Sequence, residues 1–174
     1  MLVAFRASVV GLVVAAALGV APGSALALGQ CRVDQLSART TGPQAGLGHV
    51  GFVLVLTNRS SVSCVTGGFV GLQRLGANRQ ALVTRVHRGS GYLFPSAAPE
   101  RLVVAPGHSV SAGVEWLDGP VRSEPESCTT AGHFLEVTPP NDTSHLTIRA
   151  ATADCAQGYL GTTALAVGAH GPAV

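Results

Sequence analysis

The sequence predicts an all-β domain built as a β-sandwich, and three observations lead to that class. Short apolar runs alternate with clusters of Gly, Pro, Ser and Asn along the chain after Leu28. One of these runs is continuous and rich in β-branched residues, and another alternates strictly between apolar and polar positions. No segment after Leu28 has an apolar helical face of two or more turns. Many short strands separated by turn signals are typical of sandwiches and barrels, and no sign of regular closure points to a barrel.

Two strands are predicted most clearly. Residues 51–57 (GFVLVLT) form a continuous apolar run, which indicates a central strand covered on both faces, and Asn58 begins a turn. Residues 109–117 alternate with period two, as expected for a strand with one buried side and one solvent-facing side. The side predicted to be buried carries Val110, Ala112, Val114 and Trp116.

The other elements have weaker signals. Residues 87–99 and 118–128 are rich in Pro, Gly and Ser, and we expect them to form extended loops. Residues 168–174 are predicted to be a flexible tail. No internal repeat is present, so residues 28–167 are expected to form a single domain. Further strands are expected at residues 69–75, 81–87, 101–105, 134–138, 146–150 and 160–167.

Residues 1–27 have the three parts of a cleavable secretory signal. One positive charge at Arg6 precedes an apolar run over residues 7–21, and Pro22-Gly23 interrupts that run. Residues 25–27 (Ala-Leu-Ala) then offer the small-x-small site that signal peptidase accepts. The apolar run has fifteen residues, fewer than the ~20 that span a bilayer, which disfavours an uncleaved anchor.

Lipid attachment is the second alternative for the N-terminus, because Cys31 follows the apolar segment closely. Attachment needs a small residue directly before the cysteine, and Gln30 is not small. We therefore expect a protein that is freely secreted or associated with the cell wall, with a mature start at Leu28 and no membrane span after signal cleavage.

Four cysteines lie beyond the predicted cleavage site, which is the arrangement expected of disulfides in an exported domain. They have no Cys-x-x-Cys pair and no zinc-like spacing with histidine. Three connectivities are compatible with four cysteines, and spacing alone does not choose among them. We favour the pairing that closes one loop in each half of the domain: Cys31–Cys64 and Cys128–Cys155.

Charge and motif patterns argue against nucleic-acid or membrane binding, against a metal site and against a catalytic serine. All eleven basic residues are Arg, they are scattered, and the net charge of +2 is too small to indicate nucleic acid or an anionic membrane. The six histidines share no metal-binding spacing, so we expect no metal and no cofactor. Residues 107–111 (GHSVS) only approach a nucleophile elbow, since the fifth residue is not Gly. Trp116 is expected in the core rather than as a sugar-stacking platform.

A set of residues in a fixed order resembles an actinobacterial exported family known as domain of unknown function 4232. The residues that carry the resemblance are Cys31, Leu56-Thr57-Asn58 with Ser60-Ser61, Cys64, Gly68-Phe69-Val70-Gly71-Leu72, Ala105-Pro106-Gly107, Cys128, Val137-Thr138-Pro139-Pro140 and Cys155. Val70 stands where the family pattern has proline, and Gln30 departs from the lipid-attachment site. The resemblance implies an immunoglobulin-like antiparallel β-sandwich with two disulfides, on or outside the cell envelope, and it implies no activity.

The leading functional hypothesis is a non-enzymatic binding or interaction module, secreted or associated with the envelope, because stapled scaffolds carry function in their loops. Its partner would be an envelope or extracellular protein or ligand. The expected contact loop contains Tyr92, Leu93 and Phe94, although the same side chains could instead fold back over the core. Two alternatives remain: a hydrolase acting on wall or environmental polymers, and a structural envelope component.

Overall fold

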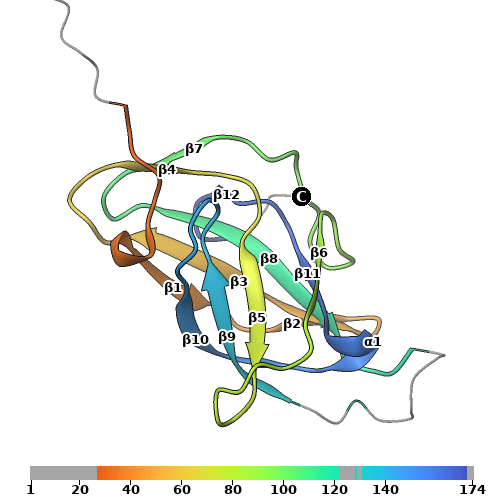
Figure 1. Cartoon of the computed structure of the whole chain (residues 1–174). Helices are drawn as coiled ribbons and strands as arrows, with labels where there is room; N and C mark the ends of the chain where they lie inside the picture. The colour runs from red at the N-terminus through yellow and green to blue at the C-terminus, as the bar shows by residue number, and fades with distance from the viewer. Residues whose placement is uncertain (1–26, 122–127, 129–130, 172–174) are drawn as a thin grey trace, which may run out of the picture.

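The computed structural model describes residues 27–121, 128 and 131–171 (Figure 1). The predicted signal peptide, except for Ala27, lies outside these residues. No helix in the described part of the chain is long and apolar enough to cross a membrane. The helical elements are the short η1 (Val33–Gln35) and α1 (Cys155–Gly158). The strands are β1 (Leu36–Thr40), β2 (Gln44–Gly46), β3 (His49–Asn58), β4 (Cys64–Thr66), β5 (Gly71–Leu75), β6 (Arg85–Arg88), β7 (Leu102–Val104), β8 (Ser109–Leu117), β9 (Gly132–Thr138), β10 (Leu146–Thr152), β11 (Tyr159–Thr162) and β12 (Ala166–Val167).

The strands form one large sheet, one small sheet and a separate pair. The large sheet has the order β1-β3-β8-β11-β6, with β2 also beside β3 and β12 also beside β8. The small sheet has the order β10-β9-β5, and β4 pairs with β7. Among the described strands every ladder is antiparallel except β6–β11, which is parallel. The all-β class is confirmed, while the immunoglobulin-like arrangement stays a prediction.

The β3–β8 ladder is the centre of the large sheet. It pairs Leu54 with Ala112 and Leu56 with Val110, and these side chains point into the main core. The opposite side of β3 carries Val53 and Val55, which are also buried. The prediction of a strand covered on both faces is therefore confirmed for residues 51–57.

The small sheet supplies the other half of the main core. Its inward side chains Leu72, Leu135 and Val137 belong to the same buried cluster as Leu54 and Val114 of the large sheet. The two sheets thus pack face to face, as expected for a sandwich. Burial of this shared apolar surface is the main source of stability.

The prediction of a solvent-facing side on β8 is wrong. Ser111 and Glu115 lie on that side, and their exposed fractions are 0% and 2%. Two segments distant in sequence cover it: the loop after β6 places Phe94 against Gly113, and the N–H of Gly171 donates to the Ser111 hydroxyl. The alternation itself is correct, but both sides of the strand are buried.

The described part of the predicted tail is attached to the sheet. The N–H of Gly168 donates to the Ser109 carbonyl at 2.9 Å, and the N–H of Gly171 donates to Ser111 Oγ at 3.0 Å. Ala169 packs against Val53 and Val55. Residues 168–171 therefore continue the packed chain past the expected boundary at Val167.

Both favoured disulfides are present. Cys31 bonds Cys64 at 2.00 Å, and Cys128 bonds Cys155 at 2.06 Å. The first bond ties the N-terminal segment to β4, where the Cys31 N–H also donates to the Val65 carbonyl. The second bond fixes Cys155 at the start of α1, just before β11. The four cysteines are thus structural residues.

Candidate functional site

The predicted contact loop divides into a buried part and an exposed part. Phe94 is 6% exposed and packs with Val53 and Val55, so this member of the loop is a core residue and not a contact residue. Tyr92 is 55% exposed, and Leu93 is half-buried. The structure therefore leaves Tyr92, with the edge of Leu93, as the accessible part of the loop.

The buried carboxylate of Glu115 holds this loop in place. Oε1 accepts the N–H of Tyr92 at 2.9 Å, and Oε2 accepts the N–H of Leu93 at 2.8 Å. A buried carboxylate needs such partners, because desolvating a charge without them is very costly. Gly91 and Gly161 lie so close to the Glu115 side chain that neither position has room for a Cβ.

His49 joins the loop to the β2–β3 hairpin. Its ring stacks on Tyr92 with 4.8 Å between ring centroids and 20° between the planes. Its Nδ1 lies 3.4 Å from Glu115 Oε1, but this contact lacks hydrogen-bond geometry, so Nδ1 has no hydrogen-bond partner. The contact becomes an ion pair only when the imidazole carries a proton.

The tip of the same hairpin exposes an apolar side chain that the sequence interpretation missed. Leu47 is 84% exposed, and its φ of 46° places it in the left-handed region. A Cβ at the adjacent Gly46 would lie 3.5 Å from Leu93 and 3.9 Å from Tyr92, so hairpin and loop are in contact. An apolar residue between two glycines (Gly46-Leu47-Gly48) was the available sequence signal. We call Leu47, His49, Tyr92 and Leu93 the hairpin–loop patch.

Tyr159 of β11 lies on the other side of Glu115. Burial raises the pKa of the Tyr159 phenol, and the charge of the nearby Glu115 carboxylate raises it further. The ring of His87 stacks over Tyr159 at 6.2 Å. Glu115 is thus surrounded by Tyr92, His49 and Tyr159, each from a different element.

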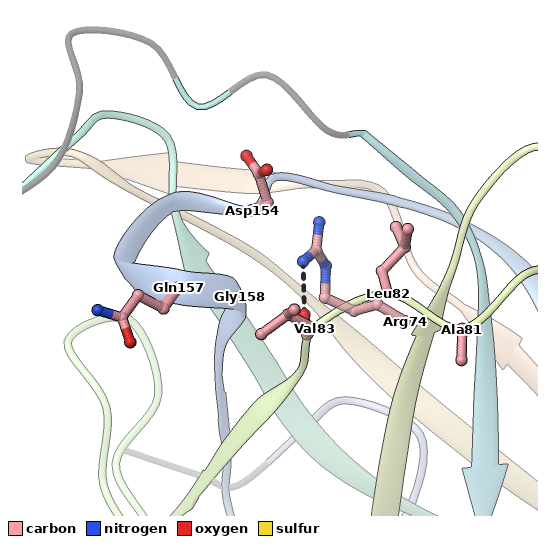
Figure 2. Close-up of a pocket in the computed structure, with 7 residues that line it drawn as sticks. All are labelled: Arg74, Ala81, Leu82, Val83, Asp154, Gln157 and Gly158. Carbon is pink, nitrogen blue, oxygen red and sulfur yellow. Dashed lines mark hydrogen bonds between the residues drawn. The ribbon is translucent and has the colours of Figure 1, made fainter.

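A buried arginine lies in a pocket of about 530 Å³ beside α1 (Figure 2). Arg74 is 0% exposed, and it donates from Nε to Thr152 Oγ1 and from an Nη to the Val83 carbonyl, each at 3.0 Å. Burial lowers the pKa of the Arg74 guanidinium, and the charge of Asp154 opposes that shift. Gly158 closes the pocket wall. These bonds connect β5, β10 and residues 81–84, which gives Arg74 a structural role that its position in an apolar run did not indicate.

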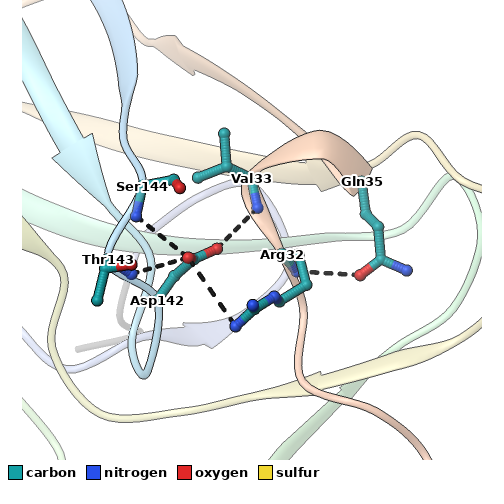
Figure 3. Close-up of polar contacts among 6 residues, drawn as sticks. All are labelled: Arg32, Val33, Gln35, Asp142, Thr143 and Ser144. Atoms are coloured by element: carbon teal, nitrogen blue, oxygen red, sulfur yellow. Dashed lines mark hydrogen bonds and ion pairs between the residues drawn. The ribbon is translucent and has the colours of Figure 1, made fainter.

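Asp142 connects the N-terminus to the β9–β10 loop (Figure 3). Its carboxylate accepts the N–H groups of Ser144, Val33 and Thr143 at 3.1, 3.0 and 2.8 Å. The Arg32 guanidinium lies 4.0 Å away. The hydrogen bonds from Ser144, Val33 and Thr143, together with the Arg32 charge, hold the pKa of Asp142 below its ordinary value, although desolvation opposes them.

A groove opens at the edge of the sandwich where the end of β1 and residues 41–43 face β10. It has a volume of about 540 Å³. Phe52 and Trp116 form its floor, with 5.5 Å between their rings. Trp116 is 7% exposed and packs in the main core, as predicted, yet it also contributes to this floor. His133 and Arg149 lie at its rim. We call this feature the edge groove.

Asn58 explains one element of the family resemblance. Its side chain is 0% exposed, and its amide donates to the carbonyls of Val62 and Val104 at 2.8 and 2.9 Å. Its Oδ1 accepts the N–H and the hydroxyl of Ser60. Asn58 therefore ties the turn after β3 to β7. Although Asn58-Arg59-Ser60 matches a glycosylation pattern, the buried amide is not accessible in the folded domain.

The described residues contain no group of three or more His, Cys, Asp or Glu side chains that could hold a metal ion. Fold and site together define a disulfide-bonded, all-β domain whose exposed features are a hairpin–loop patch and an edge groove. The family model "Domain of unknown function (DUF4232)" matches residues 31–170, and the chain belongs to this family. No curated protein and no solved structure matches the chain.

Proposed function

We propose that this protein is a non-enzymatic interaction module, secreted or associated with the cell envelope, that binds an extracytoplasmic partner through the hairpin–loop patch. The observation that carries the proposal is that Tyr92 is more than half exposed and yet fixed in position. Its backbone is held by Glu115 and its ring by His49. An exposed aromatic side chain would ordinarily be mobile, whereas this one has a defined orientation.

A pre-ordered aromatic side chain is well suited to binding. Association costs about 0.5–1.5 kcal/mol for each mobile side chain that it immobilises, and a side chain already held in place avoids that cost. Tyrosine is also enriched among the residues that dominate binding energy, because it combines apolar area with a polar hydroxyl. Leu47 extends the patch with an exposed apolar side chain beside it.

The compartment is part of the same proposal. Two disulfides close loops of 33 and 27 residues, and such bonds persist in oxidising surroundings. The three-part pattern of residues 1–27 supports the same location. Detection of the mature protein, beginning at Leu28, in culture medium or wall extract would test this part.

Affinity capture with matched variants tests the patch. The exported protein serves as bait for the envelope fraction, alongside a Leu47→Ser/Tyr92→Ser variant and a Val103→Ser/Val167→Ser control. Val103 and Val167 are 54% and 72% exposed on other strands, so the control removes similar apolar surface elsewhere. We expect a partner whose binding falls by about 10-fold or more in the patch variant and is unchanged in the control. Equal capture by all three baits would refute the patch as the binding surface.

A further inference from the structure

The outer edge of β6 has the properties of a docking edge for an extended peptide. β6 is the last strand of the large sheet, and β11 is the strand beside it (Figure 1). The ladder between them is parallel and spans Arg85 to Arg88. In the part of the chain that the structure describes, no other strand pairs with β6. Such an edge can accept a strand from a partner, which then extends the sheet.

The hydrogen-bond pattern identifies the backbone groups on that edge. The N–H of Gly89 donates to the Thr162 carbonyl at 3.0 Å, toward β11. Alternate residues of a paired strand turn their backbone groups to opposite sides, so every second residue before Gly89 also faces β11. The N–H and carbonyl groups of Val86 and Arg88 therefore point to the outer edge, where an incoming strand could bond to them.

The side chains along this edge are basic. Arg85, His87 and Arg88 are exposed, and they make up three of the four residues of β6. Neither arginine forms an ion pair with a described residue. Opposite charges across a strand pair stabilise it, whereas like charges destabilise it. A second copy of β6 would bring these arginines against one another, so the charge of the edge disfavours self-pairing and favours an acidic strand.

Two contacts hold β6 in its extended form before any partner arrives. The Val86 side chain packs against the main core. On the opposite face of the strand, the ring of His87 stacks on Tyr159 of β11 with 6.2 Å between ring centroids. A partner strand therefore does not have to order this edge, which lowers the entropic cost of binding.

We propose that β6 binds an extended acidic segment of a partner protein, which joins the large sheet as a further strand. Backbone hydrogen bonds to Val86 and Arg88 supply affinity, and acidic side chains beside the basic ones of β6 supply specificity. This edge shares no residue with the hairpin–loop patch, so either proposal can fail without the other.

Synthetic probes separate strand pairing from plain charge attraction. The acidic peptide acetyl-TEVEVET-amide is titrated into the exported protein, and NMR follows the signals and the hydrogen exchange of the Val86 and Arg88 amides. The peptide TQVQVQT lacks the charges, and TEVEVET with N-methyl groups on its three central amides keeps the charges but loses those donors. A dextran sulfate oligosaccharide is an anion without a peptide backbone. We expect saturable binding of the acidic peptide with slower exchange of both amides, about 5-fold weaker binding of TQVQVQT and at least about 10-fold weaker binding of the methylated peptide.

Matched variants locate the site. Arg85→Gln/Arg88→Gln removes two charges from the edge, and we expect it to weaken binding of the acidic peptide by about 5-fold. Arg59→Gln/Arg101→Gln removes the same charge at exposed positions outside the strands and should leave binding unchanged.

Several results would each overturn the proposal. They are the absence of saturable binding, equal affinity of the methylated peptide, and equal binding by the two double variants. Slower exchange of the Val86 and Arg88 amides with dextran sulfate would identify an anionic polysaccharide as the occupant instead. Shifts of these amides that depend on protein concentration alone would identify a second copy of this chain.

Discussion

The carboxylate of Glu115 accepts the backbone N–H of Tyr92 at 2.9 Å, across 23 positions of the sequence. Glu115 lies on β8 in the middle of the large sheet, whereas Tyr92 lies on the surface, so this bond connects a central strand to an exposed loop. The same carboxylate also accepts the N–H of Leu93. The position of the loop therefore depends on one buried acidic side chain.

Replacement of Glu115 by Gln should loosen the loop. One carbonyl oxygen remains to accept, but the amide group of Gln cannot accept the second N–H, which leaves a buried donor unpaired. We expect the free energy of unfolding to fall by about 1–3 kcal/mol, and hydrogen exchange at Tyr92 and Leu93 to accelerate. Glu136→Gln is the control, because the Glu136 carboxylate is partly exposed and lies 3.2 Å from the exposed His145, so its replacement should change stability by less than about 1 kcal/mol. Unchanged exchange at both amides would contradict this account.

The same substitution at the two aromatic residues of the loop should change the stability of the fold by very different amounts. Phe94→Ser removes a side chain that is 6% exposed and fills the space beside Gly113, so we expect a loss of about 3–5 kcal/mol in thermal or urea unfolding. Tyr92→Ser removes an exposed ring and should change stability by about 0.5 kcal/mol or less. A large loss in the Tyr92 variant would mean that the ring supports the fold, and the hairpin–loop patch would then lose its central residue.

Asp142 should make stability depend on acid. Its pKa in the folded protein is below the ordinary value of 3.8, so its contribution is fully present above about pH 4 and is lost as the pH falls through the folded-state pKa. Asp142→Asn should therefore be less stable than the wild type at neutral pH, and the difference should shrink below about pH 4. Urea midpoints measured for both proteins across that range provide the test. A difference that stayed constant with pH would show that the carboxylate charge is not responsible.

Asn58-Arg59-Ser60 and Asn141-Asp142-Thr143 both match the glycosylation pattern, and their asparagines offer a matched pair of substitutions. Asn58→Asp places a carboxylate against the carbonyls of Val62 and Val104, in a position that is 0% exposed. We expect a loss of about 3 kcal/mol or more, because two donors are removed and a charge is buried. Asn141→Asp makes the same chemical change at an exposed residue and should be nearly neutral. Similar midpoints for the two variants would contradict the role assigned to Asn58.

Removal of either disulfide should cost a comparable amount. The closed loops span 33 and 27 residues, which corresponds to about 3.5–4 kcal/mol each in the chain-entropy model. Cys31 and Cys64 also belong to the main core, so Cys31→Ala/Cys64→Ala should lose more than Cys128→Ala/Cys155→Ala. Urea unfolding of both double variants tests this order. The reverse order would mean that the C-terminal bridge carries more of the stability than core packing indicates.

Local patterns predicted the strands well where a strand has a strong pattern of its own. β8 begins and ends at the predicted residues, and the continuous run of β3 was identified as a central strand. β1, β2 and β4 were missed because they are short and mixed in composition. A strand was predicted from residue 81, but β6 begins only at Arg85, because residues 82 and 84 form hydrogen bonds with Gln73 and Arg74 of β5 instead. Such strands form through their partners rather than through their own sequence.

The candidate functional surfaces were harder to predict, for a related reason. The burial of Glu115 depends on a loop and on a C-terminal segment that are far away in the chain, and no periodicity within β8 records them. The same holds for the edge groove. Its lining residues come from both sheets and lie together only after the two sheets have packed. Sequence did identify residues 92–94 as a loop of interest, but the fold decided that Tyr92 faces outward and Phe94 inward.

The C-terminal segment has a consequence for the order in which this domain can be completed. Residues 159–171 complete the surroundings of β8: β11 and β12 pair with the edge that β3 leaves open, and the N–H of Gly171 donates to the Ser111 hydroxyl. A chain that emerges from its N-terminus onward, from a ribosome or a translocation channel, can therefore complete the burial of Glu115 and Ser111 only after residues 159–171 have emerged. Until then β8 is an unpaired edge strand, and such an edge can pair with another chain.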